Sequence, residues 1–372
     1  MSDKIRVGTR KGFFTFEREG SGWRQASPDF PGVPVPMFHQ DKRDGALYVA
    51  AEHEHFGTKL HLLREGESEW VELDPPVYPE KPDDAPVILD PWRKVEVPWS
   101  LKKVWSLESG GDDRPGVLWC GTIPGGLFKS TDHGASWELV RSLWDRSERA
   151  RWSGGGYDFP GIHSICVHPE NSDIISVGVS CGGVWRTCDG GLSWEQSAHG
   201  MRYDFVPEEQ GGADPESQDP HRIVQCQGDP KRFWSQHHCF IYRSDDEGKS
   251  WKEFSEVSPS AFGFAVAVHP QEPDTAWFVP AKKDEHRYPV DGKFVVTRTR
   301  DGGETFETLD AGLPSGPAYD LVYRHALSVD DTGNCLVMGS TTGSVWVSED
   351  QGDSWSKLTS HLPPVYCVAF SR

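Results

Sequence analysis

The sequence has no long apolar run, and no stretch approaches the roughly 18 residues that a membrane-spanning helix needs. Its opening residues, MSDKIRVGTRKG, contain no apolar core of the kind found in signal peptides. Positive charge is also scarce: 38 Lys and Arg residues face 57 Asp and Glu residues, which gives a formal net charge of −19. That balance disfavours binding to nucleic acid or to an anionic membrane surface.

Cysteine motifs are missing as well. None of the eight cysteines forms a C-x-x-C pair, which argues against a disulfide framework and against a zinc ribbon. We therefore expect reduced thiols and a cytoplasmic protein, either a monomer or a small homo-oligomer. Cys166, Cys226 and Cys367 occupy equivalent positions in SICVH, VQCQG and VYCVA, so they are interpreted as small core residues. Nucleotide-binding, P-loop, nucleophile-elbow and zincin motifs are absent too, so redox and acyl-transfer chemistry have no support.

Turn-forming and aromatic residues are abundant instead, with 39 Gly, 28 Pro and 16 Trp, as is typical of many short strands joined by turns. One phrase occurs five times, as STDHGASW, RTCDGGLSW, RSDDEGKSW, RTRDGGETF and VSEDQGDSW. Two degenerate copies end at Trp23 and Trp70, so the chain holds seven repeats. The aspartates of the five clear copies are spaced by 57, 57, 55 and 49 residues; they are Asp132, Asp189, Asp246, Asp301 and Asp350.

Residues 161–200 show the plan of one repeat most clearly. GIHSICVHP, DIISVGVSCGG, VWRTCD and SWEQSAHG are interpreted as four successive strands, and none shows a sustained helical period. Four antiparallel strands per repeat are typical of a β-propeller blade. We therefore predict an all-β fold: a seven-bladed β-propeller of four-stranded antiparallel blades, formed by residues 1–372 as one domain.

The two ends of the sequence are predicted to share one blade. KIRVGTR, GFFTFE and GWRQAS match strands two to four of a repeat, and the C-terminal PVYCVAFSR matches the innermost strand of other repeats. The first blade should therefore combine residues 1–30, approximately, with residues 364–372. The C-terminal strand would close the ring by pairing into the N-terminal blade.

The repeated phrase lies at the hairpin between the third and fourth strands of a repeat. Its Asp can accept hydrogen bonds from N–H groups of the turn, and its Gly supplies a positive φ. The aromatic residue that ends it can bury one face between blades. Because five copies of one active site in one chain would be odd, we interpret the phrase as structural rather than catalytic.

These copies resemble the Asp-box, or bacterial neuraminidase repeat. That repeat is found in sialidases, oligoxyloglucan-specific glycoside hydrolases, sortilin-type receptors and photosystem II assembly factors. The resemblance covers nearly the whole chain and implies a propeller. It does not fix a function, because those relatives include both enzymes and binding proteins.

Long insertions concentrate on one face of the predicted propeller, where the loops between blades and between strands two and three emerge. A lidded binding site on that face is the favoured interpretation, and the alternative is that the loops are only solvated excursions. The insertions span residues 74–100, 143–160, 200–221 and 282–292.

Histidines and charged residues gather at the strand ends that should line the axis on this face. His53 and His55 are two residues apart on an expected strand, so they would form a chelating pair for Zn²⁺ or another divalent metal. The predicted metal ligands are His53, His55, His163 and His238; the predicted substrate-binding residues are Arg222, His237, Lys282, Lys283 and Tyr366; and the predicted catalytic residues are Glu54, His163, Glu285 and Asp320. Glu52, His221, His286 and Tyr319 belong to the same expected rim. A wet channel without a metal is the alternative.

We expect an enzyme: a hydrolase or lyase acting on a small polar or anionic substrate, such as a carbohydrate, with or without help from a metal. Sialidase activity is disfavoured, because no Phe/Tyr-Arg-Ile-Pro segment occurs near the N-terminus and seven repeats do not fit a six-bladed ring. The tandem-propeller oligoxyloglucan hydrolases also match poorly, since this chain has repeats for one ring only. The alternative is a non-enzymatic, protein-binding propeller resembling an assembly factor.

Overall fold

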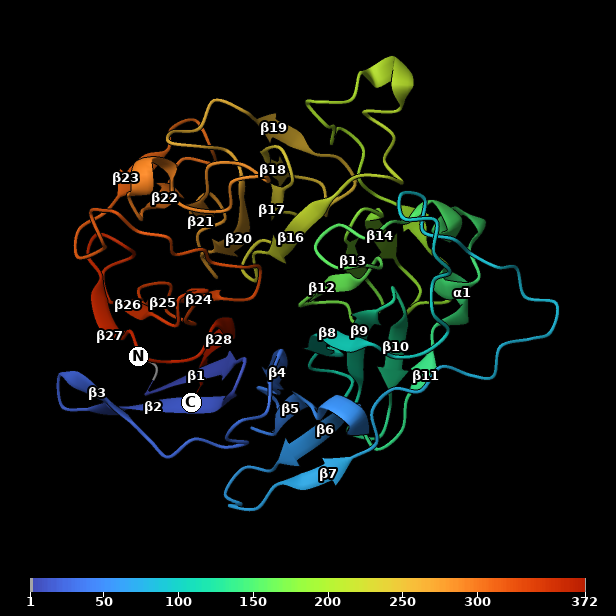
Figure 1. The fold of residues 1–372 in the computed structure, drawn as a ribbon, viewed down its shortest axis with the longest axis horizontal. Helices are drawn as coiled ribbons and strands as arrows, with labels where there is room; N and C mark the ends of the chain where they lie inside the picture. Colours follow the sequence, from blue (N-terminus) through green and yellow to red (C-terminus); the bar gives the residue numbers. More distant parts are fainter. Residues whose placement is uncertain (1–2, 372) are drawn as a thin grey trace. The chain divides into compact units, whose positions relative to one another are not determined.

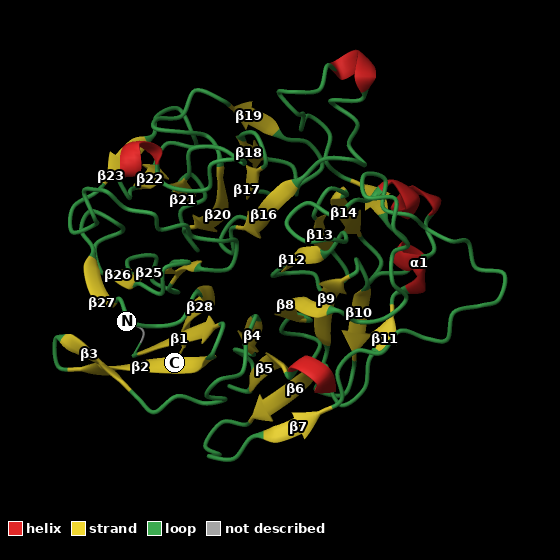
Figure 2. Ribbon diagram, in the orientation of Figure 1, coloured by secondary structure: helices red, strands yellow, loops and turns green. Residues whose placement is uncertain are grey.

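The computed structural model describes residues 3–371, so Met1, Ser2 and Arg372 lie outside the described residues. Strands and loops make up nearly all of that range (Figure 2). The strands form seven four-stranded sheets in which neighbouring strands run antiparallel. The predicted seven-bladed β-propeller is confirmed. Among residues 3–371, no helix has both the length and the apolar character needed to cross a membrane.

The first four sheets in chain order begin with the sheet that contains the first and last strands. Their strands are β28 (Val365–Ser371), β1 (Lys4–Thr9), β2 (Gly12–Glu19) and β3 (Gly22–Gln25); β4 (Met37–Gln40), β5 (Leu47–Glu52), β6 (Thr58–Leu63) and β7 (Val71–Leu73); β8 (Lys103–Ser109), β9 (Leu118–Ile123), β10 (Leu127–Ser130) and β11 (Glu138–Leu139); and β12 (Ile162–Val167), β13 (Ile175–Val179), β14 (Gly183–Thr187) and β15 (Glu195–Gln196).

The last three sheets follow the same plan, and the helices all lie in the connections. The strands are β16 (Pro220–Gln225), β17 (Phe233–His237), β18 (Ile241–Ser244) and β19 (Lys252–Phe254); β20 (Gly263–Val268), β21 (Ala276–Pro280), β22 (Val296–Thr299) and β23 (Glu307–Leu309); and β24 (Leu327–Val329), β25 (Leu336–Gly339), β26 (Val345–Ser348) and β27 (Ser356–Thr359). The helices are η1 (Glu54–Phe56), α1 (Arg141–Trp144), η2 (Ser147–Arg151), η3 (Glu208–Gln210) and η4 (Val290–Gly292).

The C-terminal strand completes the N-terminal sheet, as the sequence predicts. In this sheet the strand order is β28-β1-β2-β3, and β28 runs beside β1 (Figure 1). Ile5 pairs with Phe370 and Val7 pairs with Val368. Val7 and Val365 are almost fully buried, so apolar packing adds to the backbone pairing. The parts of this prediction that fall on Met1, Ser2 and Arg372 lie outside the described residues.

The chain divides into two compact units, each with its own core. Unit 1 contains Met1–Pro36, Val224–Asp245 and Lys252–Arg372, and unit 2 contains Met37–Ile223 and Asp246–Trp251. Apolar side chains of strands β1, β21, β25 and β28 meet in one cluster of unit 1. In unit 2, one cluster joins sheets β4–β7 and β8–β11, and another joins sheets β8–β11 and β12–β15. The expectation of a single domain stays a prediction.

The repeated Asp binds the residue four positions later in all five copies. In the second copy, the Asp189 carboxylate accepts hydrogen bonds from the backbone N–H of Ser193 at 2.9 Å and from the Ser193 hydroxyl at 2.5 Å. The hydroxyl of Thr187 donates to the same carboxylate at 2.7 Å. Gly191, with φ of 94°, occupies the left-handed region that the turn requires. The contacts to the residue four positions later are repeated at Asp132, Asp246, Asp301 and Asp350.

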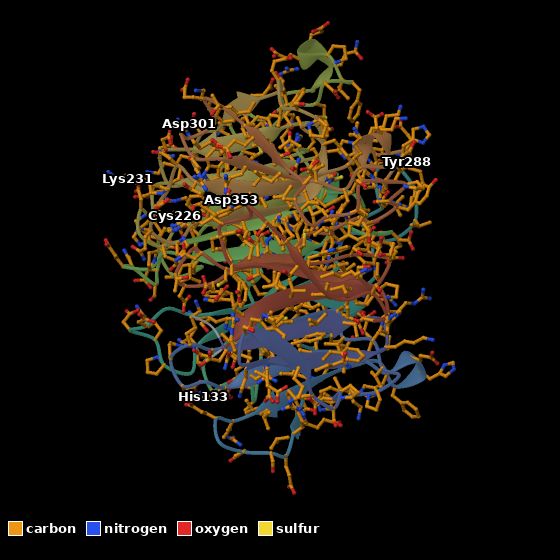
Figure 3. All side chains as sticks on the ribbon, turned by 90° about the vertical axis from the view of Figure 1, so that its left-hand side faces the viewer. His133, Cys226, Lys231, Tyr288, Asp301 and Asp353 are labelled. Carbon is orange, nitrogen blue, oxygen red and sulfur yellow. The ribbon has the colours of Figure 1, made fainter. Side chains whose placement is uncertain are left out.

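In unit 1 the hairpins and one long loop lie on opposite sides. Asp301 and Asp353, both in repeated hairpins, lie on one side, and Tyr288 lies on the other (Figure 3). Tyr288 belongs to the loop between β21 and β22, which includes the predicted insertion 282–292. For this loop and these hairpins, the structure agrees with the predicted distribution over two faces.

Candidate functional site

Two long insertions of unit 2 are tied to each other by hydrogen bonds. The carboxylate of Asp90, a fully buried side chain, accepts a hydrogen bond from the Gly154 N–H at 2.8 Å. Trp92 Nε1 donates to Ser153 Oγ at 3.1 Å, and Arg93 Nη1 donates to the Gly154 carbonyl oxygen at 3.1 Å. The insertion 74–100 therefore holds the loop that carries Tyr157 in place.

An ion pair lies beneath that loop. Lys103, the first residue of β8, has its Nζ 2.6 Å from Oε1 of Glu52, the last residue of β5. The same ammonium lies 5.2 Å from the ring centroid of Tyr157. Both charged side chains are mostly buried, while the Tyr157 side chain remains 39% exposed. A ligand that reaches the open part of this ring would therefore lie close to the ion pair.

Aromatic contacts extend from this ring to His163. Tyr157 packs edge to face on Trp105 with the centroids 5.1 Å apart, and Trp105 packs in the same way on His163 at 5.5 Å. His163 Nδ1 shares a 2.8 Å hydrogen bond with Ser164 Oγ, which also accepts the Ile223 N–H. His163 is fully buried. The structure thus places this histidine inside unit 2, whereas the sequence predicts it at an open rim.

A second buried pair in unit 2 joins Asp219 and His221. Asp219 Oδ2 lies 3.5 Å from His221 Nε2, and both side chains are almost fully shielded from solvent. Asp219 also accepts hydrogen bonds from the Cys181 N–H at 3.1 Å and from the Ser180 hydroxyl at 3.4 Å. Arg222, the next residue along β16, is half-buried.

The expected chelating geometry of His53 and His55 is wrong. Strand β5 ends at Glu52, and residues 54–56 form the short helix η1. Glu54 adopts a φ of 42°, which turns the chain before His55. The two histidines therefore do not occupy alternate positions of one strand. The physical reason is the tight connection, in which the His53 N–H donates to the Gly57 carbonyl oxygen at 2.9 Å.

The predicted residues Lys282, Lys283 and Glu285 share one tight loop of unit 1. Lys282 Nζ donates to the Tyr288 hydroxyl at 3.3 Å, and Lys283 Nζ lies 3.2 Å from Glu285 Oε2. A backbone hydrogen bond and the Lys283 ammonium lower the pKa of Glu285. The ring of Tyr319, which is 66% exposed, lies 5.9 Å from that of Tyr288. This loop and the neighbouring Tyr319 therefore present aromatic rings and cations together.

Asp320 is already engaged by two hydroxyl groups within unit 1. Its carboxylate accepts a hydrogen bond from Ser340 Oγ at 2.7 Å and another from Thr342 Oγ1. Only 8% of the residue is exposed. The sequence predicts Asp320 at the start of a strand, but it lies in the loop that precedes β24.

The remaining predicted residues of unit 1 lie at strand ends and on the closing strand. His237 is fully buried at the end of β17, and its Nδ1 accepts the Cys239 N–H at 3.1 Å. His238 is half-buried, with its ring edge to face against Phe262 at 6.0 Å. Tyr366 is half-buried on β28.

Four residues of these clusters are not among those predicted from the sequence: Lys103, Trp105, Tyr157 and Asp219. Lys103 and Trp105 alternate in KKVWS, which directs both side chains to one face of the expected strand. Asp219 and His221 alternate in the same way in DPH, so a signal for both pairs is present in the sequence. Tyr157 gives no such signal, because it lies in a loop whose path depends on the insertion 74–100.

Comparisons with known proteins place xyloglucanases among the similar proteins. No protein-family model matches the chain. A curated protein from Neosartorya fischeri, a probable oligoxyloglucan-reducing end-specific xyloglucanase, is 24% identical over 279 residues, covering 67% of this chain and 31% of its own length. The chain therefore spans under a third of that relative. The sequence predicts a poor match to hydrolases of this kind, because the chain has repeats for one ring only, yet one of them is among the similar proteins.

Solved structures share the fold. The GH74 xyloglucanase from Xanthomonas campestris superposes with a TM-score of 0.65 at 18% identity, covering all of this chain and 53% of that enzyme. A structure of YCF48 bound to a D1 peptide superposes with a TM-score of 0.52 at 12% identity, covering 96% of this chain and 84% of that protein. At these identities the likeness establishes the propeller and leaves the activity open.

Proposed function

We propose that this chain is a glycoside-hydrolase-like enzyme that acts on a polar oligosaccharide. The observation that carries the proposal is the Glu52–Lys103 ion pair beneath the partly exposed ring of Tyr157. A sugar can stack its C–H face on an aromatic ring, and a carboxylate beside it can transfer a proton to or from a glycosidic oxygen. The similarity to xyloglucanases supports a carbohydrate as the substrate class.

Glycoside hydrolysis needs two carboxyl groups, one that donates a proton and one that acts as base or nucleophile. We propose Glu52 with the predicted catalytic residue Glu54 in unit 2, and the predicted catalytic residues Glu285 and Asp320 in unit 1, as the candidates for these groups. His163 is proposed as a proton relay. Elimination, the lyase alternative, would need one base and no nucleophilic water. Arg222, His237, Lys282, Lys283 and Tyr366 stay proposed substrate-binding residues.

The test is hydrolysis of xyloglucan oligosaccharides, measured as released reducing ends and by product chromatography. Glu52→Gln and Glu54→Gln form a matched pair, since they lie two residues apart and only Glu52 is ion-paired with Lys103. Loss of about 100-fold or more in kcat for Glu52→Gln, with folding intact, would support an acid–base role. Glu285→Gln and Asp320→Asn are tested in the same way. Full activity of all four variants would overturn the assignment of the carboxyl groups. The absence of any glycan turnover by the parent would overturn the proposed enzyme.

Two finer assignments belong to the same proposal. We propose that the repeated hairpin is an Asp-box, because all five carboxylates have equivalent hydrogen bonds to the residue four positions later. We also propose a cytoplasmic location, because all eight cysteines are free thiols. Detection of the protein in a cell-free culture filtrate would contradict that location.

A protein-binding propeller is the second candidate, and one observation favours it. The insertion 74–100 carries several exposed apolar side chains: Val77, Val87, Leu89, Trp92 and Val95. Exposed apolar groups gathered on one segment are typical of interaction surfaces. The peptide complex of the structurally similar YCF48 is compatible with such a role. Inactivity toward glycans, together with peptide binding that Leu89→Asp and Trp92→Ala abolish, would favour this candidate over the hydrolase.

A further inference from the structure

Two histidines lie side by side in sheet β4–β7 of unit 2. The ring centroids of His53 and His61 are 6.0 Å apart, and their planes are inclined by 56°. His61 is held in the middle of β6, where Val49 of β5 and Glu72 of β7 are its cross-strand neighbours. His53 follows β5 directly. Strand pairing therefore fixes His61, and the backbone hydrogen bond from the His53 N–H to the Gly57 carbonyl oxygen holds His53.

The ring of His53 contains a polar atom without a partner. Its Nε2 is shielded from solvent and has no hydrogen bond to any of residues 3–371. A buried imidazole nitrogen that has lost water and gained no partner raises the free energy of the fold. A ligand that binds this nitrogen would remove that cost.

A carboxylate on β7 is the cross-strand neighbour of His61. Glu72 pairs with His61 across β6 and β7, and its Oε1 lies 2.6 Å from Lys59 Nζ. The Lys59 ammonium lowers the pKa of Glu72, and His61 and His53 act in the same direction. The carboxylate is therefore ionised at neutral pH and is exposed enough to change partners.

His61 lies in a buried part of the sheet. Burial lowers the pKa of His61, and the neighbouring His53 lowers it further, although Glu72 opposes the shift. Only 8% of His61 is exposed.

We propose that His53, His61 and Glu72 form a binding site for one divalent transition-metal ion, with Zn²⁺ as the best match. Two imidazole nitrogens and one carboxylate oxygen are ligands that Zn²⁺ accepts, and water can fill the remaining position. Glu72 would exchange Lys59 for the ion by rotating its side chain. The site goes beyond the proposed hydrolase, because it can hold an ion whether or not the chain cleaves glycans. It also replaces His55 by His61 as the partner of His53.

The test uses untagged full-length protein, stripped with a chelator and titrated with Co²⁺, whose visible spectrum reports its ligands. One Co²⁺ per chain, displaced by Zn²⁺, is expected. His53→Ala, His61→Gln and Glu72→Gln should each weaken binding by more than about tenfold. His55→Ala is the matched control beside His53, and His133→Ala is a distant exposed control; both should bind as the parent does. Zn²⁺ should also raise the melting temperature of the parent but not of His53→Ala.

Other outcomes would overturn the site. If His55→Ala or His163→Ala weakens binding as strongly as His53→Ala, the ion belongs to the four-histidine set predicted from the sequence. If the parent binds no Co²⁺, there is no site. Should buried His61→Gln fail to fold, His53→Ala decides alone, because His53 lies in the connection that follows β5. Loss of glycan hydrolysis with Co²⁺ binding intact would affect only the proposed function.

Discussion

The buried guanidinium of Arg298 donates a 2.7 Å hydrogen bond from Nη1 to the backbone carbonyl oxygen of Gln351, which lies in the next repeated hairpin. Arg298 lies three residues before the repeated Asp301. The arginines at the equivalent position of two other repeats also reach the following hairpin: Arg243 donates to the Gly302 carbonyl oxygen, and Arg186 pairs with Glu247. In each case the contact is made to the residue directly after the repeated Asp. These side chains therefore connect consecutive hairpins within a unit.

We predict that Arg298→Ala lowers the free energy of unfolding by about 2–4 kcal/mol, because it removes a buried cation that also pairs with Glu307 and Asp353. Arg300→Ala is the matched control. Arg300 is half-exposed, and its ion pair with Asp353 is long, at 3.6 Å. Its removal should therefore lower the free energy of unfolding by less than about 0.5 kcal/mol. Urea unfolding followed by tryptophan fluorescence measures both. Equal stability of the two variants would contradict this role for Arg298.

The fold could be predicted from the sequence because local signals repeat along the chain. The arginines are part of that pattern, since RTCD, RSDD and RTRD all begin with one. Their partners could not be predicted from the sequence. Each contact joins two residues that lie about one repeat apart in the chain, and it depends on how neighbouring sheets pack.

The candidate site could be predicted less well for a related reason. Which residues cluster near strand ends follows from counting along the repeats, and Lys282, Lys283 and Glu285 do share one loop as expected. The geometry of His53 and His55 depends on where β5 ends, and a left-handed Glu54 ends it earlier than the pattern suggests. The long insertions have no repeat to follow, so Tyr157 could not be placed from sequence.

The repeated aspartates predict a specific acid sensitivity. Hydrogen bonds from Ser193 and Thr187 lower the pKa of Asp189 to about 2, against about 4 in an unfolded chain. The ionised carboxylate therefore adds stability above about pH 4, and this contribution is lost as the pH falls toward 2. Parent protein should lose melting temperature more steeply over that window than Asp189→Ala. Parallel pH profiles of the two proteins would show that the carboxylate does not stabilise the turn.

We predict that deleting residues 365–372 prevents stable folding. The deletion removes β28, the innermost strand of the first sheet, and uncovers the buried side chains of Ile5 and Val7. It also leaves the inner edge of β1 unpaired. Circular dichroism and thermal melting test the truncation, with deletion of Arg372 alone as the control. A cooperative melt at the parent temperature would rule out closure by this strand.

The last prediction concerns the ring of Tyr157. If sugar stacks on its exposed part, Tyr157→Ala should raise KM about fivefold, which corresponds to about 1 kcal/mol of lost contact, and should leave kcat within about twofold. Tyr157→Phe should behave as the parent, because the ring and its packing on Trp105 are kept. Phe205→Ala, a change at another exposed aromatic residue, is the control. A fall in kcat without a change in KM would instead mean that Tyr157 acts by positioning the Lys103–Glu52 pair, and an unchanged KM and kcat would remove Tyr157 from the site.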